Sequence, residues 1–173
     1  DLHCNSFACF FILIYKNIIN KNLEFVMSTQ IIALEEINFE QWLPLWQSYL
    51  TFYKTQLSDA QIRLSWKRIT NPEQADIFGF AIKVDENVVG FAHLNSHIST
   101  WVDLPYCYLQ DLYVDEAFRN QGLARKLIEH CFQFCTGKFD CVYWLTHETN
   151  IPAQHLYDQV ANKTGNIHYK KTL

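Results

Sequence analysis

The sequence predicts an α/β domain with a mixed central sheet and helices on both of its faces. Short apolar runs typical of strands alternate along the chain with longer segments in which apolar residues recur at helical spacing. The chain has 173 residues, of which 49% are hydrophobic and 16% aromatic, so it is long enough and apolar enough to bury one compact core. No repeat or low-complexity linker divides it, and we therefore expect one domain.

The first 26 residues are expected to lie outside this domain. They include the apolar run 7–15, which is too short to span a bilayer and lacks the basic region and the cleavage site of a signal peptide. Their bias toward Phe, Ile, Asn and Lys resembles translated noncoding DNA rich in A and T. We therefore expect the natural start at Met27, the only methionine, and a functional domain spanning 27–173. A membrane-associating segment at 1–26 is the alternative.

The domain is expected to begin with a strand and a helix. The run 30–37 has the composition of a strand. Asn38 and Gln41 form a capping box, which opens a helix that reaches about residue 54. Pro44 either kinks this helix or marks its true first turn, because proline has no backbone N–H to donate.

A second helix and a hairpin should follow. Ser58 and Gln61 form another capping box, and the helix that they open ends before residue 71. Strands at 78–84 and 88–97 are separated by a short polar turn, which is typical of a hairpin.

The sequence of the second half of the domain predicts alternating strands and helices. Its central helix has apolar residues along one face and ends near Gly137. The other predicted elements of this half are strands at 106–114, 141–146 and 166–170 and a helix at 151–161.

A charged, glycine-containing turn, DEAFRNQGLA, joins the strand 106–114 to the central helix. The first N–H groups of a helix have no partner within it and lie at the positive end of the helix dipole. Gly122 and the small Ala124 would let a bulky group approach these donors, and Arg119 and Arg125 add positive charge. The pattern favours a site for a phosphate-bearing ligand, whereas an ordinary strand-to-helix turn is the alternative.

Two motifs in this order resemble one known family. RNQGLA, after LQDLYV, is similar to the Q/R-x-x-G-x-G/A signature of the GNAT superfamily of N-acetyltransferases, and TNIPAQHLYD at 149–158 is similar to its second segment, N-x-x-A-x-x-L-Y. WLPLWQSYLTFY, CYLQDLYV and YWLTHETN resemble in particular the bacterial relatives of yeast histone, polyamine and D-amino-acid acetyltransferases. The resemblance covers nearly all of 27–173 and implies the GNAT fold, a mixed sheet with splayed strands.

The resemblance implies that the anion is the pyrophosphate of coenzyme A, with acetyl-CoA as cosubstrate and no metal. The strand before the motif would bind the pantetheine arm, contain a bulge, and splay from the strand 141–146. One departure from the family pattern is Ala124, where many members have glycine, and another is Asn166, where relatives often have Phe. The implied cofactor-binding residues are Leu112, Tyr113, Val114, Arg119, Gln121, Gly122, Leu123, Ala124, Arg125 and Asn150.

The resemblance also implies two catalytic residues. Tyr157 matches the tyrosine that protonates the departing thiolate, and a packed helix tyrosine is the alternative interpretation. Asp111 could act as the base, directly or through water, or could bind a second amine of the substrate. His93, His147 and Glu148 are alternatives for the base.

The acceptor would bind near residues from several segments. The aromatic residues Trp42, Trp46, Tyr49 and Tyr53 recur at helical spacing, and most of them are expected in the core. Only the end of this stripe, Phe52 and Tyr53, is expected to wall the acceptor site. Gln110, which stands where some polyamine-acetylating relatives have glutamate, and Glu148 complete the predicted substrate-binding residues.

The predicted activity is transfer of an acetyl group to the primary amine of a polyamine, an amino acid or a lysine-bearing peptide. A binding protein of the same fold that senses acyl-CoA without turnover is one alternative. A cysteine hydrolase using Cys107 or Cys141 is another, although no nucleophile motif surrounds either residue. A net charge of −4 and a pI near 5.9 give no support for nucleic-acid binding and suit a cationic small substrate better.

The six cysteines show no C-x-x-C spacing, so we expect free thiols and a cytoplasmic protein. A zinc site built from Cys131, Cys135, Cys141 and a histidine is disfavoured by the ligand spacing. The resemblance further implies a homodimer formed through sheet edges and C-terminal strands, and no membrane partner.

Overall fold

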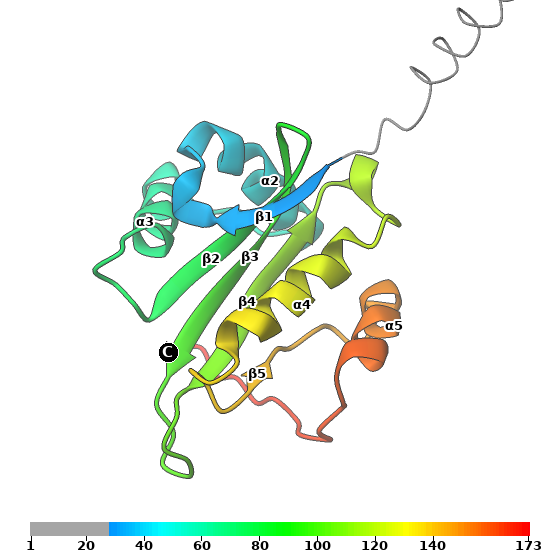
Figure 1. Ribbon diagram of the computed structural model, residues 1–173. Helices are drawn as coiled ribbons and strands as arrows, with labels where there is room; N and C mark the ends of the chain where they lie inside the picture. The colour runs from blue at the N-terminus through cyan, green and yellow to red at the C-terminus, as the bar shows by residue number, and fades with distance from the viewer. Residues whose placement is uncertain (1–27) are drawn as a thin grey trace, which may run out of the picture.

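A five-stranded sheet with helices on both faces forms the body of the protein, as the sequence predicts (Figure 1). The computed structural model describes residues 28–173, so the predicted extension at 1–26 lies outside the described residues. The strands are β1 (Thr29–Ala33), β2 (Ile77–Val84), β3 (Asn87–His97), β4 (Tyr106–Val114) and β5 (Val142–Tyr143). The helices are α2 (Phe39–Phe52), α3 (Asp59–Ile69), α4 (Leu123–Cys135) and α5 (Ile151–Val160), with 3-10 turns η1 (Leu34–Glu36) and η2 (Glu116–Phe118).

The strands lie in the order β1-β2-β3-β4-β5. The first four pair antiparallel, and β5 is parallel to β4. Helices α2 and α3 cover one face, with a core that includes Trp42, Trp46 and Phe91. Helices α4 and α5 cover the other face, where Leu127 and Ile128 are fully buried. The sheet thus separates two hydrophobic cores. Val142 of the edge strand β5 packs against the core under α4 and α5.

Both predicted capping boxes are present. The Asn38 side chain accepts a hydrogen bond from the Gln41 backbone N–H at 2.9 Å, and the Ser58 side chain accepts one from that of Gln61 at 3.3 Å. Pro44 lies inside α2, so the idea that it marks the first turn is wrong. The capping box places the helix start five residues earlier than the proline, at Phe39.

The first strand is shorter than predicted. It ends at Ala33, and η1 follows instead of a continued strand to residue 37. The Glu36 carboxylate accepts a hydrogen bond from the Ala33 backbone N–H at 2.9 Å. This local bond satisfies the donor and turns the chain, while Leu34 enters the α2–α3 core.

The predicted strand at 166–170 does not form. Residues 161–173 have no regular secondary structure. The neighbouring edge strand β5 has only two residues, so it offers little backbone to pair with, and the side chains of Ile167 and Tyr169 are exposed. Because the segment 166–170 gains neither burial nor strand pairing, no favourable free energy offsets the loss of conformational entropy that an ordered strand would require.

The predicted bulge and splay of the sheet are both confirmed. His93 pairs with Asp111 and Leu94 with Leu109, so Gln110 is an extra residue in β4. Beyond Cys107 and Tyr108, β4 and β5 no longer pair, and the strand predicted at 141–146 contributes only Val142 and Tyr143 to the sheet. Trp144 instead packs against Phe132 of α4 and Tyr157 of α5.

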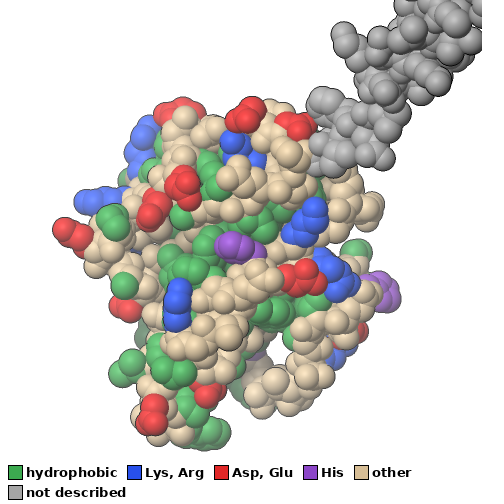
Figure 2. All heavy atoms as spheres, viewed as in Figure 1, with side chains coloured by type: hydrophobic (Ala, Val, Ile, Leu, Met, Phe, Trp, Pro, Cys, Tyr) green, Lys and Arg blue, Asp and Glu red, His purple; other side chains and the backbone are tan. Residues whose placement is uncertain are grey.

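Three of the four described cysteines are buried free thiols, as predicted, and Cys141 is exposed. Within residues 28–173, no three His, Cys, Asp or Glu side chains come together in a way that could hold a metal ion. In the same residues no helix is both long and apolar enough to cross a bilayer. Acidic and basic side chains intermingle on the face seen in Figure 2, without a continuous basic surface there.

Candidate active site

The turn before α4 is built to expose backbone N–H groups. Gly122 caps the helix with φ +75°, a left-handed conformation that glycine adopts readily, and Asn120 also has a positive φ of 61°. A Cβ atom added to Gly122 would meet nothing within 4 Å, so the space in front of the helix is open. The first backbone bond of α4 runs from the N–H of Lys126 to the Gly122 carbonyl, which leaves the preceding amides of the turn for a ligand.

Arg119 is anchored beside this turn by three contacts. Its Nε donates to the Val114 carbonyl at 3.1 Å, Nη1 donates to Glu116 at 3.1 Å, and Cζ lies 5.7 Å from the centre of the Tyr113 ring. These contacts tie the turn to the end of β4 and hold a positive charge next to the open amides.

Arg125 lies on the first turn of α4 and connects it to α5. Its guanidinium donates to the Gln159 side chain and lies 3.9 Å from Glu129. Arg119 and Arg125 therefore flank the turn before α4, and contacts to β4 and to α5 hold them there.

The gap between the diverging β4 and β5 holds a narrow cavity of about 20 Å³. Its walls come from α2, β4, the segment after β5, and α5. The lining residues are Tyr49, Tyr53, Leu109, Gln110, Leu112, Trp144, Leu145 and Tyr157. The cavity therefore brings together four predicted site residues from three segments of the chain, namely Tyr53, Gln110, Leu112 and Tyr157.

Tyr157 points its ring toward Trp144, with the ring centres 5.3 Å apart and nearly perpendicular. Burial raises the pKa of Tyr157 to about 12, and the neighbouring Tyr53 adds to the shift. The phenol therefore keeps its proton at neutral pH, which is the state that a proton donor needs.

Asp111 of β4 is buried and contacts two neighbouring side chains. Its Oδ1 accepts a hydrogen bond from the Tyr49 hydroxyl at 2.7 Å, and its Oδ2 lies 3.0 Å from His93 Nδ1. His93 Nε2 in turn accepts a hydrogen bond from Trp42 Nε1 at 3.1 Å. Asp111 itself does not line the cavity, whereas Tyr49 does.

Tyr49 is a site residue that the sequence prediction missed. The aromatic stripe of α2 was expected to be core except at Phe52 and Tyr53, and Trp42 and Trp46 are indeed buried. Tyr49 differs because its ring packs on Trp46 while its hydroxyl reaches Asp111. Its four-residue spacing from Tyr53 places both rings on the same side of the helix and was the available signal.

The loop before α5 holds the remaining predicted residues. Asn150 caps the start of α5, and its side chain donates to Thr146 at 3.2 Å. Glu148 is exposed and does not line the cavity, although its backbone carbonyl accepts a bond from Gln154 at 2.8 Å. Of the alternative bases, His147 bonds to Thr149 within this loop and His93 is enclosed in the network described above.

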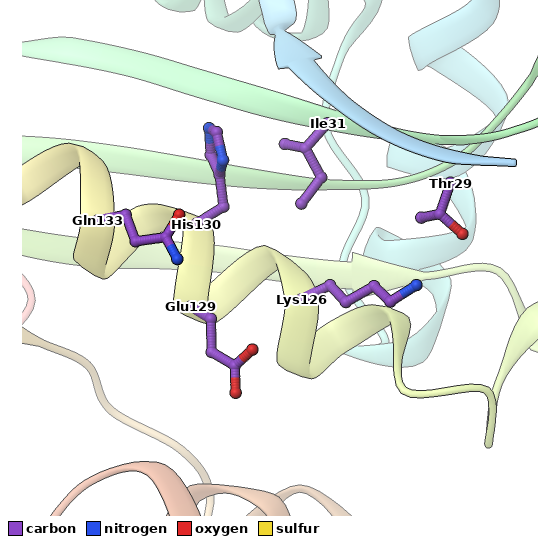
Figure 3. A pocket seen from close by; sticks show the side chains of 6 residues that line it. All are labelled: Thr29, Ile31, Lys126, Glu129, His130 and Gln133. Carbon is purple, nitrogen blue, oxygen red and sulfur yellow. The ribbon is translucent and has the colours of Figure 1, made fainter.

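A larger, shallow hollow of about 360 Å³ lies elsewhere, between β1 and α4 (Figure 3). It is lined by Thr29, Ile31, Lys126, Glu129, His130 and Gln133, none of which is a predicted site residue. His130 packs edge-on against Phe80 with ring centres 4.6 Å apart, and burial lowers the pKa of this histidine. The predicted site residues that line a cavity do so in the narrower β4–β5 gap and not in this hollow.

A profile of the acetyltransferase (GNAT) family matches residues 32–161, which include every strand except the first part of β1 and all the helices described above. The chain belongs to the GNAT family. A curated GNAT relative, the D-amino-acid N-acetyltransferase HPA3 of Saccharomyces cerevisiae, is 34% identical over 145 residues, covering 80% of this chain and 88% of that protein. The chain is accordingly an acetyl-CoA-dependent N-acetyltransferase.

Solved structures confirm the GNAT fold. An aminoglycoside acetyltransferase, meta-AAC0020 from an uncultured soil metagenomic sample, has a TM-score of 0.70 and 22% identity, covering 84% of this chain and 96% of that chain. The aminoglycoside N-acetyltransferase AAC(6')-Iy in complex with CoA has a TM-score of 0.71 and 17% identity, covering 84% and 95%. The ribosomal-protein-alanine N-acetyltransferase of Brucella melitensis biovar Abortus 2308 has a TM-score of 0.69 and 17% identity, covering 84% and 100%.

Proposed function

We propose that this GNAT enzyme transfers an acetyl group directly from acetyl-CoA to the primary amine of a small molecule or a lysine side chain. The observation that carries the proposal is the β4–β5 gap, where Tyr157 of α5 lies beside the part of β4 that β5 leaves unpaired. The exposed amides before α4 follow β4 in the chain. Coenzyme A supplies the acetyl group as a thioester when it is bound.

The turn before α4 would hold the pyrophosphate of coenzyme A. The open space at Gly122 and the free amides of the first helical turn suit an anion, and Arg119 and Arg125 add positive charge. Gln121, Leu123 and Ala124 belong to the same turn. The edge of β4 at 112–114, which β5 leaves unpaired, would bind the pantetheine arm, and Asn150 at the start of α5 would contact the cofactor from the other side.

Two groups would serve the transfer itself. The thiolate that leaves needs a proton, and Tyr157 is a protonated phenol facing the gap. The oxyanion formed at the acyl carbon needs N–H donors held in place, which the unpaired edge of β4 would supply.

The acceptor would lie against Tyr53 and Gln110, with Glu148 at the rim. These residues, with the carboxylate of Asp111 behind Tyr49, favour a positively charged amine. The yeast relative is named for D-amino acids. We therefore place amino acids, polyamines and lysine side chains ahead of aminoglycosides as acceptors.

The test is release of free thiol from acetyl-CoA in the presence of single amines. The panel should contain D- and L-amino acids, diamines, polyamines, lysine peptides and an aminoglycoside. We expect turnover with at least one cationic or amino-acid acceptor. Tight binding of acetyl-CoA without turnover of any amine would instead indicate a non-catalytic acyl-CoA-binding protein.

We further propose that the functional domain spans 27–173 and that the protein is a cytoplasmic homodimer. The support for the dimer is likeness to the family alone, since the C-terminal strand through which it was expected does not form. Three buried free thiols suit a reducing compartment. Light scattering should give twice the chain mass at micromolar concentration, and a monomer mass would contradict the dimer.

A further inference from the structure

Four side chains from three elements form one continuous hydrogen-bonded chain behind the acceptor side of the gap. Trp42 of α2 bonds to His93 of β3, His93 bonds to Asp111 of β4, and Asp111 bonds to Tyr49 of α2. The three inner residues are almost fully enclosed, with exposed fractions of 0% for Trp42, 3% for His93 and 9% for Asp111. Only the outer member, Tyr49, lines the cavity.

The indole N–H of Trp42, at the buried end of the chain, fixes which atom donates in each of the three hydrogen bonds. An indole N–H can only donate, so His93 Nε2 must accept with its lone pair. The imidazole is then neutral and its single proton lies on Nδ1, from which it donates to Asp111 Oδ2. Tyr49 donates to the other carboxylate oxygen. Both oxygens of Asp111 therefore accept, which is the arrangement of a charged carboxylate.

The negative charge of Asp111 has no cation beside it. Among residues 28–173, the only basic side chain within 4.0 Å of this carboxylate is His93, which Trp42 keeps neutral. A buried carboxylate held by neutral donors lowers its free energy by taking up a proton or by approaching a cation. A substrate ammonium in the gap offers both, and Tyr49 is the member of the hydrogen-bonded chain that lines the gap.

We propose that Tyr49 is the catalytic residue that receives the proton of the acceptor amine, and that Trp42 and His93 are positioning residues that keep Asp111 charged for this step. This proposal rests on the acetyltransferase function proposed above. The ammonium R–NH3⁺ passes one proton to the Tyr49 oxygen, and the Tyr49 hydroxyl proton moves to Asp111 Oδ1. The products are a neutral amine with a free lone pair, an unchanged phenol and a protonated carboxyl group.

Several tyrosines and one arginine surround this chain. Tyr49 and Tyr53 face it from α2, Tyr108 and Tyr113 from β4, Tyr157 from α5, and Arg119 lies beyond the Tyr113 ring. Burial raises the pKa of Tyr49, Tyr53, Tyr108 and Tyr157 above the usual tyrosine value. These four phenols therefore keep their protons at neutral pH.

The first arm of the experiment measures turnover of the best acceptor found in the amine panel. Tyr49→Phe and Asp111→Asn should each lower kcat by about 10²–10⁴, with the KM for acetyl-CoA unchanged. The double variant should be no slower than either single one, because both remove the same step. Tyr143→Phe is the matched control, since its hydroxyl bonds to His97 outside this chain, and it should keep the wild-type kcat.

The second arm tests the role of Trp42. Trp42→Phe leaves His93 Nε2 free to bind a proton, and an imidazolium beside Asp111 would neutralise the carboxylate. The variant should therefore show a loss of kcat that grows as the pH falls and that the wild type does not show. Trp66→Phe is the matched control, because the Trp66 ring lies 5.2 Å from that of Trp42 but no indole bond to His93 is lost.

The third arm needs no substrate. Nitrogen-15 NMR of the histidines at pH 7 should show His93 as the neutral Nδ1–H tautomer in the wild type and should show that this fixed tautomer is lost in Trp42→Phe. A charged or Nε2–H His93 in the wild type, or a Tyr49→Phe kcat within threefold of the wild-type value, would overturn the proposal. If the NMR result holds but no amine is acetylated, the proposed function fails, and the role of Tyr49 fails with it.

Discussion

Tyr157 lines the β4–β5 gap. Burial, together with the neighbouring Tyr53, raises the pKa of Tyr157 to about 12. A phenol that holds its proton so firmly can still donate to a thiolate in the transition state, where the departing sulfur gains charge. Replacing Tyr157 with Phe should therefore lower kcat by about 10²–10⁴ and leave the affinity for acetyl-CoA near the wild-type value. Steady-state kinetics and calorimetry would check this, and unchanged turnover would assign the proton to water or to another group.

The same raised pKa predicts how stability depends on pH. The proton of Tyr157 is bound more tightly in the folded state than in the unfolded state, where the pKa is near 10. Its contribution is therefore complete below pH 10 and is lost as the pH rises from 10 to 12, by about 2–3 kcal/mol at most. Urea unfolding at pH 8 and pH 11 should show a smaller alkaline loss for Tyr157→Phe than for the wild type. Tyr169→Phe, at an exposed residue, should behave like the wild type.

Trp42 and Trp46 stack on each other in α2, but only one of their indole N–H groups has a hydrogen-bond partner among the described residues. Trp42 Nε1 donates to His93, whereas Trp46 Nε1 is buried without a hydrogen-bond partner among the described residues. Removing the first N–H leaves His93 Nε2 unpaired, and removing the second takes away an unsatisfied donor. Trp42→Phe should therefore lower the free energy of unfolding by about 1–3 kcal/mol more than Trp46→Phe. If urea titrations give the two variants equal losses in the free energy of unfolding, the lost ring volume and not the hydrogen bond accounts for the destabilisation.

At the scale of one element, α4 offers a comparison between its two ends. Gly122 before the helix and Gly137 after it both have φ +75° and open space where a Cβ would stand. Gly122→Asp and Gly137→Asp should thus strain the backbone similarly, by about 1–2 kcal/mol. Only Gly122→Asp places a negative charge at the proposed pyrophosphate site, so only this variant should lose coenzyme A binding by calorimetry. Equal binding by the two variants would contradict the cofactor site.

Elements that depend on local chemistry could be predicted from the sequence, and elements that depend on distant partners could not. The two capping boxes and the amphipathic α4 follow from spacings of three or four residues and are found where expected. β5 and the segment 166–170 have the composition of strands, but their pairing depends on where β4 stops offering an edge. Tyr49 was missed for a similar reason, because its hydroxyl bonds to a residue 62 positions away.

At the scale of the whole molecule, the described fold begins with the contacts of Ser28. Its backbone N–H donates to the Asp85 side chain at 3.0 Å, and its carbonyl accepts from the Asp85 N–H at 2.8 Å. We therefore expect the chain shortened to 27–173 to keep its kcat and its melting temperature within about 2 °C. A chain that starts at Leu34 should melt far lower, because it lacks β1. Loss of activity after removal of 1–26 alone would contradict the proposed domain limits.

The order of the strands explains why the two reacting sides can meet. In the proposed function, α2, β3 and β4 build the acceptor side and the α4 turn and α5 build the cofactor side, on opposite faces of the sheet. The gap where β4 and β5 stop pairing would connect the two sides. The position of this gap depends on how all the strands of the sheet are paired, and no single sequence motif predicts that pairing.

The brevity of β5 has a consequence for how the enzyme completes a cycle. The segment from Trp144 to Val160 follows the two paired residues of β5 and is held by apolar packing of Trp144, Leu156, Tyr157 and Val160 and by the bond from Arg125 to Gln159. Because few backbone hydrogen bonds tie it to the sheet, we expect this segment to open locally at a lower free energy than the four antiparallel strands. The proton donor would travel with it. Departure of the spent thiol and withdrawal of the acid would then be one movement, which guards the new amide from the reverse reaction.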